Sequence, residues 1–186
     1  MSYLYHGTIC VINNIDLNKC RSRTDFGKGF YMSSKLKTAR DWAIGKPSLE
    51  MKTPTVMRYK INDAIYTDIV IKKLVFTTPT KEWLNFVRDN RQRKNSTTSE
   101  REPRHTYDVV SGPIADDKVV DVVNEYCKSL ISAEDAISRI KTLPNVIQTS
   151  FHTPLALSYL SSFSYSQCLN NKWCDWKEHE FYNVST

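Results

Sequence analysis

The fold is decided by two short stretches, Leu4-Tyr5-His6-Gly7-Thr8 and Asp25-Phe26-Gly27-Lys28-Gly29-Phe30-Tyr31-Met32-Ser33. Three of the five glycines in the chain lie in them. Glycine loses more conformational entropy on folding than any other residue, so a glycine-poor chain uses it where the backbone turns sharply or approaches another group closely. The pattern favours a site that holds a flat ligand between an aromatic ring and bare backbone.

The two stretches resemble the NAD-binding halves of the ADP-ribosyltransferase superfamily, on the branch shared by diphtheria toxin and the poly(ADP-ribose) polymerases. That branch carries a His-Gly-[Ser/Thr] strand end, followed by a Gly-Lys-Gly segment that runs through one aromatic or aliphatic residue to a Tyr. More closely, the chain resembles a bacterial family with this fold. Its pattern reads LYHGT, DFGKGFY, WA, EWLxFVxxNR, YDxVxGPxADD and QxxFHT, and each piece is present in order between residue 4 and about residue 157.

The expected fold is α+β, because predicted strands stand at both ends of the chain with helices between them. The resemblance implies the ADP-ribosyltransferase-like fold, in which two small antiparallel sheets splay around an NAD cleft with flanking helices. A length of 186 residues fits a single domain over 1–186. We expect a mobile basic loop at about 91–106 and a C-terminal tail at about 164–186 with no assignable pattern.

Hydrophobic periodicity and capping residues predict the individual elements. Strands are expected over 3–11 (or as two short strands around His6-Gly7), 57–61, 65–76, 107–111 and 145–151. Helices are expected from Ser34 to Gly45, from Thr78-Pro79 through Val87, from Asp116 to Leu130, from Ser132 through Ile140, and from Thr153-Pro154 to Leu160.

Bulk composition bounds the environment and the partners. No apolar run approaches the ~20 residues that a membrane span needs, and the N-terminus lacks the basic and apolar regions of a secretory signal. Five scattered cysteines without a CxxC pair favour reduced thiols in a cytoplasmic protein over a disulfide framework or a zinc site. The net charge of +6 suits an acidic partner, which includes nucleic acid and a dinucleotide, although it equally suits a solubilising surface.

The resemblance assigns His6 to the adenosine ribose hydroxyls of NAD⁺, through its imidazole. The backbone that follows, at Gly7 and Thr8, would bind the nicotinamide amide, since a residue without a side chain leaves its peptide groups open to a planar amide. By itself, a histidine near an N-terminus is more often an ordinary surface or core residue.

Tyr31 is expected to stack on the positively charged nicotinamide ring, since an aromatic face attracts a cation, while Phe30 points into the core. The resemblance gives Trp42 as a second stacking ring, and packing of Trp42 between its helix and a sheet is an equally good interpretation. Gly29 and Ser33 are the remaining NAD-binding positions that the motif implies.

Gln148 stands where the superfamily usually carries a Glu that binds the 2′-hydroxyl of the nicotinamide ribose and stabilises the oxocarbenium-like transition state. An amide oxygen can still accept a hydrogen bond from that hydroxyl, but it carries no negative charge and takes no proton at neutral pH. The expected catalytic residues are therefore His6, Tyr31 and Gln148, and transfer would add single ADP-ribose units rather than build chains.

A separate carboxylate, or the acceptor itself, would then have to supply any base. Four carboxylates are candidates for that role: Asp108, Asp116, Asp117 and Glu180. For Asp116 the preferred interpretation is the N-cap of a helix. Lys28, Arg21 and Arg23 are candidates for the phosphates of NAD⁺. A Cys–His hydrolase built on His152 with Cys127 or Cys168 is the weakest alternative, because neither thiol has a neighbour that would lower its pKa.

The resemblance as a whole implies a mono-ADP-ribosyltransferase that consumes NAD⁺, needs no metal and modifies a protein or nucleic acid. A toxin of a toxin–antitoxin or phage-defence system would fit, with a cognate antitoxin protein as a further partner. The alternatives are an NAD glycohydrolase, a catalytically weak NAD- or ADP-ribose-binding module marked by Gln148, and a basic nucleic-acid-binding domain without an NAD site.

Overall fold

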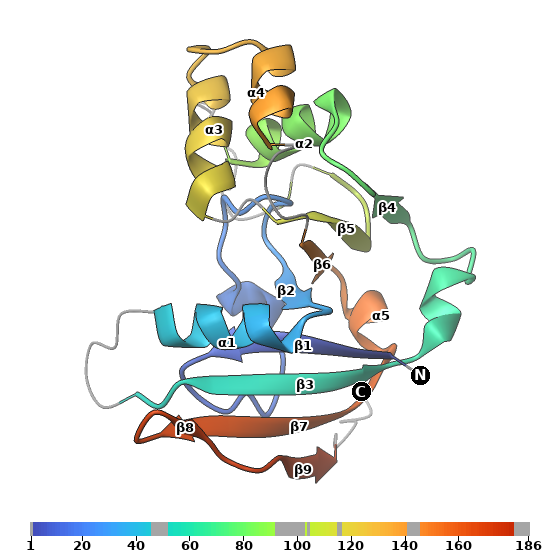
Figure 1. Cartoon of the computed structure of the whole chain (residues 1–186). Helices are drawn as coiled ribbons and strands as arrows, with labels where there is room; N and C mark the ends of the chain where they lie inside the picture. The colour runs from blue at the N-terminus through green and yellow to red at the C-terminus, as the bar shows by residue number, and fades with distance from the viewer. Residues whose placement is uncertain are drawn as a thin grey trace. The chain divides into compact units, whose positions relative to one another are not determined.

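A computed structural model of the protein describes residues 2–45, 52–91, 103, 105–114, 117–140 and 146–180. The chain divides into two units (Figure 1). Unit 1 consists of Met1–Ile15, Tyr31–Val70 and Pro154–Thr186, and unit 2 of Asp16–Phe30 and Ile71–Thr153. Strands and helices occur in both, which confirms the α+β class.

Unit 1 is built on an antiparallel sheet. Its order is β2-β1-β3-β7, and the outer edge of β7 pairs with both β8 and β9. The strands are β1 (Ser2–Thr8), β2 (Phe30–Ser33), β3 (Thr55–Ile61), β7 (Leu160–Leu169), β8 (Lys172–Trp173) and β9 (Lys177–Glu180). In β3 the alternation predicted from the sequence is confirmed, since Met57, Tyr59 and Ile61 are buried while Arg58 and Lys60 are only half-buried.

Helix α1 (Leu36–Gly45) packs on β1 and β3 of this sheet. Ala39 and Ala43 meet Val56 in a buried cluster, and Trp173 and Trp176 pack against it. The two tryptophans near the C-terminus therefore cap the core of unit 1. The unit also contains the short helix α5 (Pro154–Leu157) and a 3₁₀ helix, Asp63–Tyr66.

Unit 2 contains three strands and three helices. Strand β4 (Lys73–Val75) pairs parallel to β5 (Val109–Pro113), and β5 pairs antiparallel to β6 (Ile147–Phe151). Because β4 and β5 are parallel, the expectation of two antiparallel sheets is wrong for these strands. Helices α2 (Lys81–Arg91), α3 (Asp117–Cys127) and α4 (Ala133–Ile140) contact one another, and a 3₁₀ helix spans Leu17–Lys19.

Capping explains the start of two helices, one that begins as predicted and one that does not. The Ser132 hydroxyl accepts from the Asp135 N–H at 3.1 Å, so the expected capping box opens α4. Helix α2 begins two residues later than expected, because Thr80 rather than Thr78 caps it by accepting from the Trp83 N–H at 3.3 Å. Helix α3 stops at Cys127, which leaves Leu130 68% exposed rather than on an apolar face.

The largest difference concerns the C-terminal region. Strand β7 is not a tail, because it pairs with β3 from Leu160 to Gln167 along most of its length. Leu160 therefore begins a strand instead of ending a helix. The predicted strand over 65–76 is shorter than expected, because only 73–75 is extended and Ile65 lies in the 3₁₀ helix. Most of the predicted loop at 91–106 lies outside the described residues.

Candidate functional site

The predicted site residues divide between the two units. His6, Gly7, Thr8, Tyr31, Ser33 and Trp42 belong to unit 1, and Gly29 and Gln148 belong to unit 2. Within the described part of the chain, no group of three His, Cys, Asp or Glu side chains is arranged to hold a metal ion.

In unit 1 the two glycine motifs meet through His6. Strands β1 and β2 pair at Tyr5 and Ser33, and the His6 ring Nδ1 lies 2.6 Å from the Tyr31 carbonyl oxygen. A carbonyl only accepts hydrogen bonds, so Nδ1 carries the hydrogen and donates it. In the neutral ring this leaves Nε2 as an acceptor, to which a hydroxyl can donate.

Gly7 has a packing role that the sequence did not reveal. A Cβ built on Gly7 would lie 2.1 Å from the Ala39 carbonyl oxygen, in the backbone of α1. The helix can approach β1 this closely only because residue 7 has no side chain. Thr8, the next residue, is 6% exposed and pairs with Thr55 across the sheet.

The aromatic candidates differ in burial. Phe30 is 5% exposed, as expected of a core residue, and Tyr31 is half-buried. Trp42 is 50% exposed on α1, where the buried positions are Ala39 and Ala43. Packing of Trp42 in the core is therefore excluded. The Ser33 hydroxyl accepts from the Lys35 N–H at 3.1 Å, at the turn into α1.

Gln148 lies in a buried polar cluster of unit 2. It is the second residue of β6, opposite Gly112 of β5, and is 9% exposed. Its Nε2 donates to Asp25 Oδ2 at 2.7 Å. The other carboxylate oxygen, Oδ1, accepts from Arg91 Nε at 2.8 Å and also from Arg91 Nη2. Arg91 closes α2, so the predicted basic loop begins with a residue that is ion-paired rather than solvated.

Asp25 is the carboxylate that sequence reasoning missed. It opens the second glycine motif, and it follows Thr24 in a turn in which the Gly27 N–H donates to the Thr24 carbonyl at 3.1 Å. Gly27 has φ +77°, a left-handed conformation that favours glycine. The position of Asp25 inside this motif was the available signal.

The carboxylates proposed from the sequence are placed differently. Both carboxylate oxygens of Asp108 accept hydrogen bonds from other segments of the chain. Oδ1 accepts from the Thr153 hydroxyl at 2.7 Å, and Oδ2 accepts from the Lys72 N–H at 2.8 Å. Asp108 therefore has a structural role, because it ties together neighbouring segments of unit 2. Asp117 begins α3, and Asp116 lies outside the described residues. Glu180 ends β9, where it pairs with Ser162.

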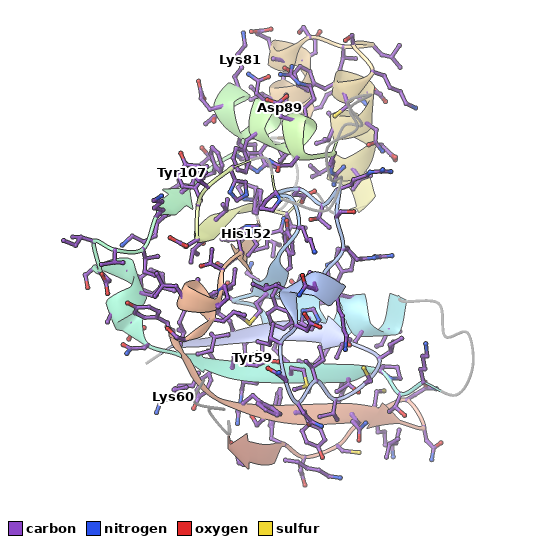
Figure 2. All side chains as sticks on the ribbon, turned by 180° about the vertical axis from the view of Figure 1, so that it is seen from behind. Tyr59, Lys60, Lys81, Asp89, Tyr107 and His152 are labelled. Carbon is purple, nitrogen blue, oxygen red and sulfur yellow. The ribbon has the colours of Figure 1, made fainter. Side chains whose placement is uncertain are left out.

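His152, labelled in Figure 2, holds the Gly27–Gly29 turn through the Lys28 carbonyl. Its Nδ1 donates to the Lys28 carbonyl at 2.8 Å, and its Nε2 lies 2.8 Å from the Ser150 hydroxyl. A Cβ on Gly29 would lie 2.6 Å from Nδ1, so Gly29 makes room for this ring. Burial lowers the pKa of His152 to about 4, which keeps the ring neutral at pH 7.

The Cys–His hydrolase alternative finds no support in these surroundings. Burial raises the pKa of the Cys127 thiol, which disfavours the reactive thiolate. The five cysteines, all within the described residues, are thiols and form no disulfide. Among the candidate phosphate ligands, Arg21 is exposed and Lys28 and Arg23 are half-buried. No helix in the described ranges is long and apolar enough to cross a membrane.

Comparison with protein families identifies the family of the chain. Residues 2–162 match the family described as "Protein of unknown function (DUF3990)", and the protein therefore belongs to that family. Comparison with curated proteins and with solved structures gives no significant match. The matched segment includes both glycine motifs, Gln148 and the start of β7.

Proposed function

We propose that this protein is a mono-ADP-ribosyltransferase of ADP-ribosyltransferase-like fold, which takes ADP-ribose from NAD⁺ and transfers it to a macromolecule. The observation that carries the proposal is the hydrogen bond between His6 Nδ1 and the Tyr31 carbonyl. It joins the two motifs of the resemblance on neighbouring strands, and in the neutral ring it leaves His6 Nε2 as an acceptor to which a ribose hydroxyl can donate. The half-buried Tyr31 and the exposed Trp42 supply the two rings proposed for nicotinamide.

In the proposed reaction, the bond between C1′ of the ribose and the nicotinamide nitrogen breaks. Its electron pair stays on the ring nitrogen, so the positively charged ring leaves as neutral nicotinamide, and positive charge develops on the ribose. A nucleophilic atom of the acceptor donates an electron pair to C1′ and loses its proton to solvent. The Gln148 amide oxygen accepts from the 2′-hydroxyl and partly offsets the developing charge.

The acceptor and the biological setting rest on composition and on the resemblance. A net charge of +6 suits an acidic acceptor such as nucleic acid or an acidic protein face. Attack by water instead of a macromolecule would make the protein an NAD glycohydrolase. A cytoplasmic toxin with a cognate antitoxin is the setting that the resemblance favours.

The first test incubates the protein with adenylate-labelled NAD⁺, in lysate and in buffer, and follows nicotinamide and labelled macromolecules. The informative variant is His6→Asn, because an Asn side-chain N–H can still donate to the Tyr31 carbonyl while the Nε2 acceptor is lost. We expect its kcat/KM to fall about tenfold or more, as for a lost hydrogen bond to substrate. His6→Ala, which also removes the link to Tyr31, should additionally lower the Tm.

The products discriminate between the candidate functions. Label that moves to protein or nucleic acid with the wild type alone supports transfer and gives the acceptor class. Nicotinamide release without labelling supports the glycohydrolase. If no nicotinamide appears and calorimetry finds no NAD⁺ binding, the proposal is wrong.

A further inference from the structure

The Asp25 carboxylate divides its two oxygens between a cation and an amide. Arg91 donates to Oδ1 through both Nε and Nη2, and Gln148 Nε2 is bound to Oδ2 at 2.7 Å. Asp25 is 7% exposed and Gln148 is 9% exposed, so water does not compete for these bonds. A buried carboxylate needs an opposite charge and hydrogen-bond donors on both oxygens, and Arg91 and Gln148 together supply them.

This arrangement permits only one orientation of the Gln148 amide. A carboxylate has acceptors and no donor, so the Nε2 end must face Asp25. The reversed amide would bring Oε1 against Oδ2, two acceptors at hydrogen-bond distance. Because the two ends of an amide point in different directions, Oε1 is turned away from Asp25. The negative charge also polarises the amide, which makes Oε1 a stronger acceptor than that of a glutamine bonded to a neutral group.

We propose that Asp25 is a positioning residue that presents the Gln148 carbonyl oxygen to the 2′-hydroxyl of the nicotinamide ribose. This inference rests on the proposed function and concerns its least expected residue. The superfamily usually has a carboxylate at the 148 position. In this protein the carboxylate belongs to Asp25, the hydrogen-bond partner of Gln148, and acts through the Gln148 amide. Arg91 keeps that carboxylate in place from the end of α2.

A charge-exchange experiment tests this assignment. Asp25→Asn keeps the size of the side chain and can still accept from Arg91, but it offers Gln148 an N–H, so the amide turns round and presents its donor end. We expect kcat for nicotinamide release to fall tenfold or more, with a smaller change in KM. Gln148→Glu alone places two carboxylates at hydrogen-bond distance, and its Tm and kcat should both fall.

The double variant Asp25→Asn with Gln148→Glu restores complementary partners with the charge moved to residue 148. The amide introduced at position 25 then donates to the new carboxylate and still accepts from Arg91. We expect the double variant to recover the Tm lost by Gln148→Glu and to release nicotinamide at least as fast as the wild type. Asp135→Asn is the control, since Asp135 is an aspartate of the same unit whose carboxylate accepts from the Ser132 hydroxyl at 2.9 Å. It should leave kcat unchanged.

The outcomes separate the inference from the proposed function. The role of Asp25 is overturned if Asp25→Asn keeps the wild-type kcat, or if the double variant has no higher kcat and Tm than the two single variants. In either case, NAD⁺ turnover by the wild type still supports the proposed function. If none of the proteins consumes NAD⁺, the proposed function is overturned and the inference with it.

Discussion

At the scale of single residues, His152 shows how one ring is kept neutral by its surroundings. Burial has the largest effect on its pKa, and the nearby His105 ring, whose centroid lies 4.5 Å away, also disfavours the charged form. The Lys28 carbonyl and Asp108 oppose this shift, but they do not outweigh it. Burial also lowers the pKa of His105, so the surroundings favour the neutral form of both rings.

The stability of the protein should therefore decrease as the solution becomes acidic. The pKa of His152 is about 4 in the folded protein and about 6.5 in an unfolded chain. The unfolded chain thus binds the proton first, and the stabilisation is complete above about pH 6.5 and is lost as the pH falls towards 4. Between pH 7.5 and 5, His152 should account for about 2 kcal/mol of lost unfolding free energy.

Urea unfolding at several pH values measures this contribution against His152→Asn. The Asn side chain can donate to the Lys28 carbonyl but does not titrate, so the two proteins should differ most at neutral pH and converge near pH 5. A difference in unfolding free energy that stays constant with pH would show that His152 does not titrate as proposed.

Some of the candidate site residues could be predicted from the sequence, and others could not. His6, Tyr31 and Gln148 follow from motifs that are contiguous or fixed in order. Asp25 and Arg91 do not, because they meet each other across 66 residues, and Asp25 meets Gln148 across 123. A carboxylate in a turn and an arginine at a helix end are each ordinary, and only the tertiary fold makes them partners.

At the scale of elements, the contact between α1 and β1 depends on Gly7. Because the atom that an added Cβ would meet is backbone oxygen of Ala39, a side-chain rotation cannot relieve the clash. Gly7→Ala should force the helix outward and destabilise the protein by about 1–3 kcal/mol, the usual cost of overpacking. Chemical denaturation measures this loss.

Gly45 at the end of the same helix is the matched control, because a Cβ there meets nothing within 4 Å. Gly45→Ala should be neutral or stabilise by up to about 1 kcal/mol, since alanine loses less backbone entropy. Equal effects of the two substitutions would contradict the proposed packing of α1 on β1.

Strand β7 shows why an element can escape prediction. Its sequence is rich in serine, a residue without the hydrophobic signal that marks a strand. Yet Ser164 and Ser166 are buried, and each hydroxyl has a hydrogen-bond partner there. Ser164 accepts from Arg58 Nε at 2.8 Å, and Ser166 donates to the Cys174 carbonyl at 2.6 Å. In contrast, β3 alternates large apolar and basic residues and was predicted correctly. Polar partners stabilise β7 where periodicity is weak.

At the scale of the whole molecule, neither unit is a continuous piece of chain. Unit 1 takes three segments and unit 2 takes two, so the second glycine motif is cut between Phe30 and Tyr31. The core of unit 2 needs Phe26, which is fully buried and far in sequence from the rest of that unit. The family match extends over both units, from residue 2 to residue 162.

The proposed function draws on residues of both units, and this leads to a prediction for the whole chain. NAD⁺ at about a hundred times its Kd should stabilise the native protein by about 2.7 kcal/mol through mass action. In hydrogen exchange, we expect added protection in peptides that cover β1 and β2 and also in those that cover β6. The His6→Asn variant at the same NAD⁺ concentration is the control and should show little of either. Protection confined to β1 and β2 would remove Gln148 from the NAD⁺-binding residues.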